Sequence, residues 1–248
     1  MTDTHIRRLA RFVSELEIDD LPESVVERVR LQHLSAAGAL RELRASAGAA
    51  ALHTSSGSRG RARKVTGGTA SARAALRLHS CLLSAWAWED GIFSGPASAG
   101  GVCTSWALAK GRSVNDVLLA TAAANEVVGR VGAAELMNGP HAQRGLRLHA
   151  LGSAVAAGKL QGLKTDALAH ALAIALSGPA SPAGGTTGLA YGGAVADAVA
   201  LGLDSVDQAK KGAHGPVGLL DESAGTLSAA FTGLGSVWLT ATISYKQL

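Results

Sequence analysis

The sequence predicts an all-α domain that ends in a short strand. Ala, Val and Leu dominate an apolar fraction of 47%, glycine adds 31 residues, and aromatic residues supply only 4% of the 248 residues. Small side chains favour closely packed helices, whereas a sheet sandwich needs more β-branched and aromatic residues. Because only 17% of the residues are charged, the chain has material for one large core, and global disorder is excluded.

Apolar residues recur at helical spacing along most of the chain. Residues 5–17 form the first such stretch, and Pro22 with Glu23 is a typical beginning of a second helix. Ser113 and Asp116 stand at the spacing of a capping box and open an Ala-rich helix. We therefore expect helices over 5–17, 23–44, 69–88, 113–136, 148–160, 166–176 and 189–201, and a short helix capped by Ser205.

Two stretches break the helical pattern. Residues 48–68 predict a loop or a short irregular hairpin around residues 63–65. Residues 237–245 alternate apolar and polar side chains, which is the period of a strand. A single strand with no visible partner indicates that its partner is missing, so we divide the chain into a helical domain, 1–236, and a terminal strand, 237–248.

Charge and cysteine content exclude several classes of protein. The formal net charge is +4, and its basic surplus centres on residues 58–64, a run without interleaved aromatic residues or a nucleic-acid module. A solvated loop is the simpler interpretation of this run, and an anion or nucleic-acid patch is the alternative. Cys81 and Cys103 are too few for a disulfide framework or a thiolate zinc site, so we expect them to fill space in the core.

The chain carries no segment typical of a membrane protein or of a metal centre. Its most apolar run, 167–176, is about half as long as a bilayer-spanning helix, and no basic-then-apolar leader precedes the first helix. No histidine pair stands at ligand spacing beside a third ligand. We expect a cytoplasmic protein with no metal, no organic cofactor, no membrane and no nucleic-acid partner.

Two acidic residues are candidates for proton transfer. Glu89 and Asp90 stand where a helix breaks into a Gly-rich loop. A carboxylate becomes a general base near neutral pH when burial raises its pKa, and the alternative is a solvated loop acid. Trp86 and Trp88 are two residues apart and point in different directions on a helix, so one packs in the core and the other lines a site.

A histidine and a tyrosine are the other candidates. His149 lies beside a small-residue helix and offers an imidazole that titrates near neutral pH; a hydrogen-bonded, partly buried histidine is the alternative. Tyr191 precedes Gly192 and Gly193, whose small size lets a ligand approach. Its phenol is able to donate to a developing enolate, and the alternative is a tyrosine packed at a helix start.

Four segments stand in a distinctive order along the chain: Asp20-Leu21-Pro22-Glu23 in the opening helices, Trp88-Glu89-Asp90 after a helix, Arg144-Gly145 before a small-residue helix, and Ser244-Tyr245-Lys246 in the terminal strand. In this order they resemble the MmgE/PrpD family, which includes 2-methylcitrate dehydratase and cis-aconitate decarboxylase. The resemblance implies a large helical domain, a smaller α+β lid domain, and an active site in the cleft between them. This chain is similar to the helical domain alone, with the lid domain absent.

The chain departs from the family at several motif positions. The family's first aspartate falls at Trp86 or Ala87, whereas its later acids match Glu89 and Asp90. A family histidine in a Thr-Lys-x-x-His-x-Gly motif is replaced by Tyr191. The resemblance therefore argues against ordinary methylcitrate or aconitate chemistry.

The remaining motif residues are also altered. Where the family has Arg-Gly-aromatic-His, this chain has Arg144 to Arg147, with His141 before them and His149 after them. Thr187 begins the altered Thr-Lys motif, and Lys246 matches a family functional residue by type.

The resemblance implies a diverged lyase, isomerase or cyclase that moves a proton beside a carbonyl or carboxylate without a cofactor. Its substrate is a small molecule, and a biosynthetic intermediate is one version of it. The expected acid–base residues are Glu89, Asp90 and His149, with Tyr191 and Lys246 as stabilisers of an oxyanion. The expected substrate-binding residues are Trp86, Trp88, His141, Arg144, Arg147 and Thr187.

Two other functions are compatible with the sequence. In one, the chain is the helical subunit of a two-chain enzyme whose lid domain is a separate polypeptide. In the other, it is a non-catalytic binding or scaffold protein, as the lost motif residues suggest. We also expect a homodimer, because helices 113–136 and 189–201 carry small side chains and the resemblance implies a dimer.

Overall fold

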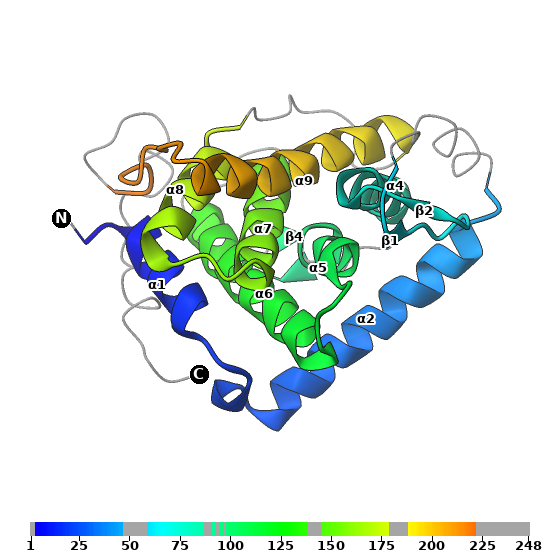
Figure 1. Ribbon diagram of the computed structural model, residues 1–248, viewed down its shortest axis with the longest axis horizontal. Coiled ribbons are helices and arrows are strands. Elements are labelled where there is room, and N and C mark those ends of the chain that lie inside the picture. The colour runs from blue at the N-terminus through cyan, green and yellow to red at the C-terminus, as the bar shows by residue number, and fades with distance from the viewer. Residues whose placement is uncertain are drawn as a thin grey trace.

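The computed structural model describes residues 3–46, 59–86, 91–92, 95–96, 98–137, 145–178 and 188–221. These residues are mostly helical, so the all-α expectation is confirmed (Figure 1). The helices are α1 (His5–Glu15), α2 (Glu23–Leu43), α4 (Ala72–Ala85), α5 (Cys103–Leu108), α6 (Val114–Met137), α7 (Gly145–Leu160), α8 (Thr165–Leu176) and α9 (Leu189–Lys210), with a 3-10 helix, η1 (Ile18–Asp20), and a π-helix, η2 (Ser98–Val102).

Four strands of two residues each form the described β-structure. Strands β1 (Ala62–Arg63) and β2 (Thr69–Ala70) pair in antiparallel register, with Ala62 opposite Ala70. Strands β3 (Gly91–Ile92) and β4 (Gly95–Pro96) form a second antiparallel pair. The β1–β2 pair is the hairpin that the sequence offered as an alternative to a loop.

Helix α7 lies at the centre of the fold, and α6, α8 and α9 pack around it (Figure 1). Every residue from 148 to 158 is buried. Small residues make this possible, because a Cβ at Gly202 of α9 would lie only 2.2 Å from the carbonyl oxygen of Ala150 in α7. A Cβ at Gly152 would lie 3.1 Å from Val128 of α6. At these glycines the helices therefore pack so closely that a side chain would not fit between them.

Helices α6 and α9 are long and apolar enough to cross a membrane by length and composition alone. In this structure 78% of the apolar window of α6 and 50% of that of α9 are buried against the rest of the chain. Core helices of globular proteins have the same composition. The cytoplasmic localisation stays a prediction.

Several element boundaries differ from those expected. The helix expected at 69–88 is shorter, because Thr69 and Ala70 pair with β1 and α4 ends at Ala85. The two helices expected after residue 189 form one continuous helix, α9. Gly202 does not end it; the residue is a glycine because α7 packs so closely there that no side chain fits. Helix α7 begins at Gly145 instead of Leu148.

Two small residues of α9 serve packing within the chain, since Gly192 meets α4 and Gly202 meets α7. Ala190 and Gly193 of the same helix are not buried. The homodimer stays a prediction. The terminal strand and the boundary at 236 lie outside the described residues and stay predictions as well.

Candidate active site at the junction of three helix ends

The C-terminal end of α4 meets the first turns of α7 and α9. The backbone N–H of Gly188, which immediately precedes α9, donates to the carbonyl oxygen of Ala85 over 2.7 Å. Gly188 has a φ of +90°, a backbone conformation that residues other than glycine rarely adopt. A Cβ built at Gly145, the first residue of α7, would lie 4.0 Å from the hydroxyl of Tyr191. Three segments distant in sequence thus share one corner of the fold.

Gly192 fixes the position of this corner. A Cβ at this residue would lie 2.4 Å from the carbonyl oxygen of Cys81 and 3.0 Å from its Sγ. No side chain fits at that distance, so α9 approaches the main chain of α4 directly. Gly193, in contrast, has nothing within 4 Å of its Cβ position. The sequence predicted that both glycines leave room for a ligand, but in the structure α4 fills the space beside Gly192.

Tyr191 is the candidate residue best placed for chemistry in the described part of the chain. It lies in the first turn of α9, is partly buried, and packs against the apolar core. Its hydroxyl lies near the start of α7, 4.0 Å from the position that a Cβ of Gly145 would take. A phenol placed between two helix starts is able to donate a hydrogen bond to an oxygen of a bound substrate.

Trp86 stands at the same corner. It is the C-cap residue of α4 and is 39% exposed, so it is one of the large apolar side chains that meet solvent. Ala85, its neighbour, accepts the hydrogen bond from Gly188. Trp86 therefore lies next to the N-terminus of α9, where an exposed indole is suited to contact a substrate.

Arg147 and His149 occupy the first two turns of α7. Arg147 is partly buried, and its Nε has no hydrogen-bond partner among the described residues. His149 has no exposed surface, and its carbonyl oxygen would lie 2.9 Å from a Cβ at Gly100 of η2. The imidazole is therefore deeper in the fold than in either interpretation of the sequence, an acid–base residue at a site or a partly buried histidine, and its catalytic role stays a prediction.

Seven predicted site residues lie outside the described residues: Glu89, Asp90, Trp88, His141, Arg144, Thr187 and Lys246. Described residues that flank three of these segments are Trp86, Gly145 and Gly188. All three belong to the helix ends that meet at this corner. The expectation that the acid segment, the Arg-Gly segment and the Gly-rich helix start come together is consistent with these flanks, and the roles of the seven residues stay predictions.

A second group of functional side chains was not predicted. Trp106 Nε1 donates to Nδ1 of His33 over 2.8 Å, and the ring of His79 meets Trp106 edge-on at 6.3 Å between centroids. Burial lowers the pKa of each histidine to about 4, so both are neutral at pH 7. Only their positions inside helices were visible in the sequence, because their shared contact with Trp106 depends on tertiary packing.

The cysteines have the role that the sequence predicted. Cys81 and Cys103 are buried and free, and burial raises the pKa of the Cys81 thiol. Within the ranges that the structure describes, no three His, Cys, Asp or Glu side chains gather in a group able to hold a metal ion.

Comparison with known proteins agrees with this architecture. No curated protein sequence matches the chain significantly. The family model described as the MmgE/PrpD N-terminal domain matches residues 7–236, which covers the helical fold and all three helix ends of the corner. The chain therefore belongs to the MmgE/PrpD family through its N-terminal domain.

Proposed function

We propose that the protein is a diverged lyase, isomerase or cyclase that works by acid–base chemistry without a cofactor. The observation that carries this proposal is the position of the Tyr191 hydroxyl, 4.0 Å from the Cβ position of Gly145 at the junction of α4, α7 and α9. Proton removal beside a carbonyl or carboxylate leaves charge on an oxygen, and a fixed hydroxyl donor stabilises that charge.

In this proposal each described side chain at the corner has a separate role. Tyr191 donates to the developing oxyanion, and Trp86 forms an exposed apolar wall. The guanidinium of Arg147, two residues after Gly145 in the first turn of α7, binds a substrate carboxylate. His149 has no exposed surface, so it acts as a positioning residue behind the site and does not touch the substrate.

The base itself is supplied by Glu89 or Asp90, which follow Trp86 in the sequence. A carboxylate in this position removes the proton, and Lys246 supports the oxyanion. The substrate is a carbonyl- or carboxylate-containing molecule, and a biosynthetic intermediate suits a chain in which several family motif residues are replaced.

A second candidate is the helical subunit of a two-chain enzyme. The matched family model is that of an N-terminal domain, and the resemblance implies that the family cleft needs a second domain. In this version the second domain is a separate polypeptide that binds beside α4, α7 and α9. A non-catalytic scaffold is the outcome that remains when neither version turns over a substrate.

Deuterium exchange tests the acid–base proposal even while the product is unidentified. The full chain is incubated in D2O with citrate, cis-aconitate and a panel of 2- and 3-oxo acids, and wash-in of deuterium is followed by NMR. We expect exchange in at least one of them, and a Tyr191→Phe variant is expected to lose about 100-fold in rate, as for removal of one oxyanion donor.

The control is Lys211→Gln, an exposed change at the far end of α9 that leaves the corner intact. Circular dichroism and the melting temperature confirm that Tyr191→Phe is folded. Equal exchange rates in Tyr191→Phe and the unaltered chain would contradict the role of the tyrosine. The two-chain enzyme would be favoured if the chain by itself catalyses no exchange but does so after a co-purified second chain is added.

A further inference from the structure

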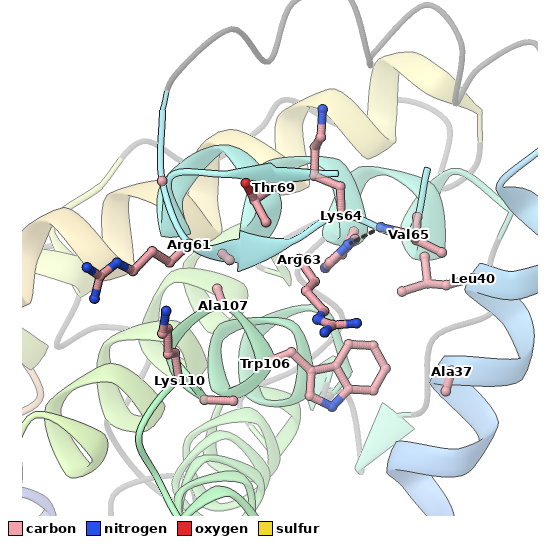
Figure 2. A pocket seen from close by; sticks show the side chains of 14 residues that line it. Ala37, Leu40, Arg61, Arg63, Lys64, Val65, Thr69, Trp106, Ala107 and Lys110 are labelled. Carbon is pink, nitrogen blue, oxygen red and sulfur yellow. Dashed lines mark hydrogen bonds between the residues drawn. The ribbon is translucent and has the colours of Figure 1, made fainter. Parts of the chain in front are cut away.

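A cavity lies at the opposite end of α4 from the Tyr191 corner. Its volume is about 840 Å³, and it opens between the β1–β2 hairpin, α2, α4 and the end of α5 (Figure 2). The cavity and the corner share no lining residue among those described, although His79 in the cavity wall lies six residues, about 9 Å along the helix axis, before Ala85. A cavity of this size matches those that hold organic ligands of drug or nucleotide size.

Basic side chains dominate the rim of this cavity. Arg61, Arg63 and Lys64 come from the hairpin, and Lys110 comes from the segment after α5. None of the described residues that line the cavity is acidic. Figure 2 shows Arg63 directed down toward Trp106 and Lys110 directed up toward the hairpin. Positive charge therefore faces the space from both sides.

Three of these cations have no ion-pair partner in the part of the chain that the structure describes. Within the described ranges, the side chains of Arg61, Arg63 and Lys110 take part in no hydrogen bond or ion pair, although many other arginines do, among them Arg7, Arg8, Arg11, Arg30, Arg73 and Arg77. Guanidinium groups favour planar or tetrahedral oxyanions, which they bind through two parallel hydrogen bonds. The cavity rim is thus suited to an anion.

A buried histidine in the wall of the cavity adds a neutral donor. The backbone N–H of Val65 donates to Nε2 of His79 over 3.0 Å, so Nε2 carries no proton. In a neutral imidazole the proton then lies on Nδ1, and this Nδ1 has no hydrogen-bond partner in the described part of the chain. His79 is only 5% exposed. A buried N–H without an acceptor costs free energy, which an acceptor atom of a ligand recovers.

The floor of the cavity is apolar and planar. Trp106 is held by its hydrogen bond to His33, and Leu40, Val65 and Ala107 line the space beside it. A fixed indole face is a surface on which flat, aromatic groups stack favourably. The ligand that suits this cavity has a planar part and an anionic part.

We propose that this cavity binds a nucleoside diphosphate or a closely similar organic phosphate. The planar base lies against Trp106, and the phosphates lie between Arg63 and Lys110. A diphosphate carries enough negative charge to balance the basic rim, and its size matches the cavity volume. This site is separate from the Tyr191 corner, and the inference does not depend on the proposed function.

Titration calorimetry on the full chain tests the proposal with four nucleoside diphosphates, ADP, GDP, CDP and UDP. Pyrophosphate, adenosine and citrate are the comparison ligands. We expect one or more of the diphosphates to bind more tightly than pyrophosphate and citrate, and adenosine to bind weakly. Arg63→Gln and Lys110→Gln are each expected to weaken binding about tenfold, the effect of one charged hydrogen bond.

Arg112→Gln is the matched control, because Arg112 is an exposed cation two residues from Lys110 that does not line the cavity. Its Kd is expected to stay within about twofold of that of the unaltered chain, as for a screened surface charge. A ¹⁵N NMR spectrum of the histidine rings gives a second readout, with a shift of His79 Nδ1 on addition of the diphosphate.

Several results would overturn the proposal. These are the absence of binding by all four diphosphates, equal binding of citrate or adenosine, and an unchanged Kd in Arg63→Gln. Tighter binding of a single-stranded oligonucleotide than of any diphosphate would assign the basic rim to nucleic acid instead.

Discussion

The two ends of α4 are built in different ways. At the C-terminal end, Gly192 lets the main chain of α9 approach that of α4 so closely that no Cβ fits between them. At the N-terminal end, the β1–β2 hairpin folds over α4 and α5 and leaves a cavity of about 840 Å³ between them. The first region is therefore sensitive to volume, whereas the second is sensitive to charge and protonation.

The family motifs and the cavity lie at different ends of α4. Two of the four segments that carry the family resemblance flank the closely packed end, at Trp86 and Gly145, and the altered motif residue Tyr191 lies there too. The cavity with a basic rim lies at the other end, lined by Arg63 and Trp106 among others. Membership of the MmgE/PrpD family thus directs attention to one corner of the fold, and the physical chemistry of the side chains directs it to another.

The largest expected effect is a loss of stability in mild acid, at the cavity end. Burial lowers the pKa of His33 and His79 to about 4, below the usual value of 6.5. Between these pH values the unfolded chain binds protons that the folded chain does not, so the free energy of unfolding falls as the pH decreases from about 6.5 to 4. Each histidine contributes about 2–3 kcal/mol to this loss by pH 4.5. Urea unfolding at pH 7 and pH 4.5 measures it.

His79→Gln and His33→Gln are the variants that identify the source. Each is expected to flatten the pH dependence by about half, because glutamine does not titrate. A pH profile of unfolding that is the same in both variants as in the unaltered chain would mean that other groups are responsible. Carboxyl groups whose pKa is lowered below the usual 3.8, such as Asp116, lose most of their stabilising effect at lower pH and contribute little in this window.

The next effect concerns volume at the other end of α4. Gly192→Ala places a methyl group 2.4 Å from the carbonyl oxygen of Cys81, so the helices must move apart. We expect a loss of about 1–3 kcal/mol in the free energy of unfolding, as for other overpacked cores. Gly193→Ala is the adjacent control, with open space around its Cβ, and is expected to gain up to about 1 kcal/mol of helix propensity.

Thermal unfolding of the two glycine variants measures this contrast directly. Each kcal/mol corresponds to about 2–4 °C in Tm for a chain of this size. Equal Tm values for Gly192→Ala and Gly193→Ala would show that α9 does not pack on α4 as closely as the distances indicate.

A smaller effect comes from the cap of α4. The Ser71 Oγ accepts a hydrogen bond from the backbone N–H of Ala74 over 3.2 Å, at the junction of the hairpin and the helix. Ser71→Ala is expected to cost about 1 kcal/mol, the usual value for a lost N-cap. Ser71→Gly, which costs about a few tenths of a kcal/mol at such positions, is the control. Chemical unfolding of both variants ranks the cap against the packing at Gly192.

Local patterns predicted most of the fold. Helix spacing located α2 and α6, and the Ser113–Asp116 capping box is present, with hydrogen bonds of 2.9 and 3.0 Å. Boundaries failed where tertiary contacts overrule local signals. The sequence reads Gly202 as part of a break between two helices, whereas contact with Ala150 makes a glycine necessary within one continuous helix.

The candidate sites were predicted less completely, for a similar reason. Tyr191 was identified from its neighbours, but the role of Gly192 depends on Cys81, a residue far away in sequence. The basic run at 58–64 was visible, and an anion patch was one of its two interpretations. Its meeting with Trp106 and His79 depends on how the hairpin folds over α4 and α5, which no local pattern specifies.

The smallest expected effect tests whether charge matters along the exposed edge of α4. Arg73 donates two hydrogen bonds from Nε, at 3.0 and 3.1 Å, and one from Nη2, at 2.8 Å, to the carboxylate of Asp204 in α9. The pair raises the pKa of Arg73, but the arginine side chain is 52% exposed. Water and salt screen such a pair, so Arg73→Gln is expected to cost only about 0.5 kcal/mol.

The loss in Arg73→Gln should shrink further in 1 M NaCl, where the screening length is about 3 Å. Urea unfolding at low and high salt, with Asp204→Asn and the double variant, gives the coupling energy of the pair. A coupling above about 2 kcal/mol that persists in high salt is more than an exposed pair supplies. It would show that charge joins α4 and α9 near the N-terminal end of α4 as strongly as the glycine contact joins them near its C-terminal end.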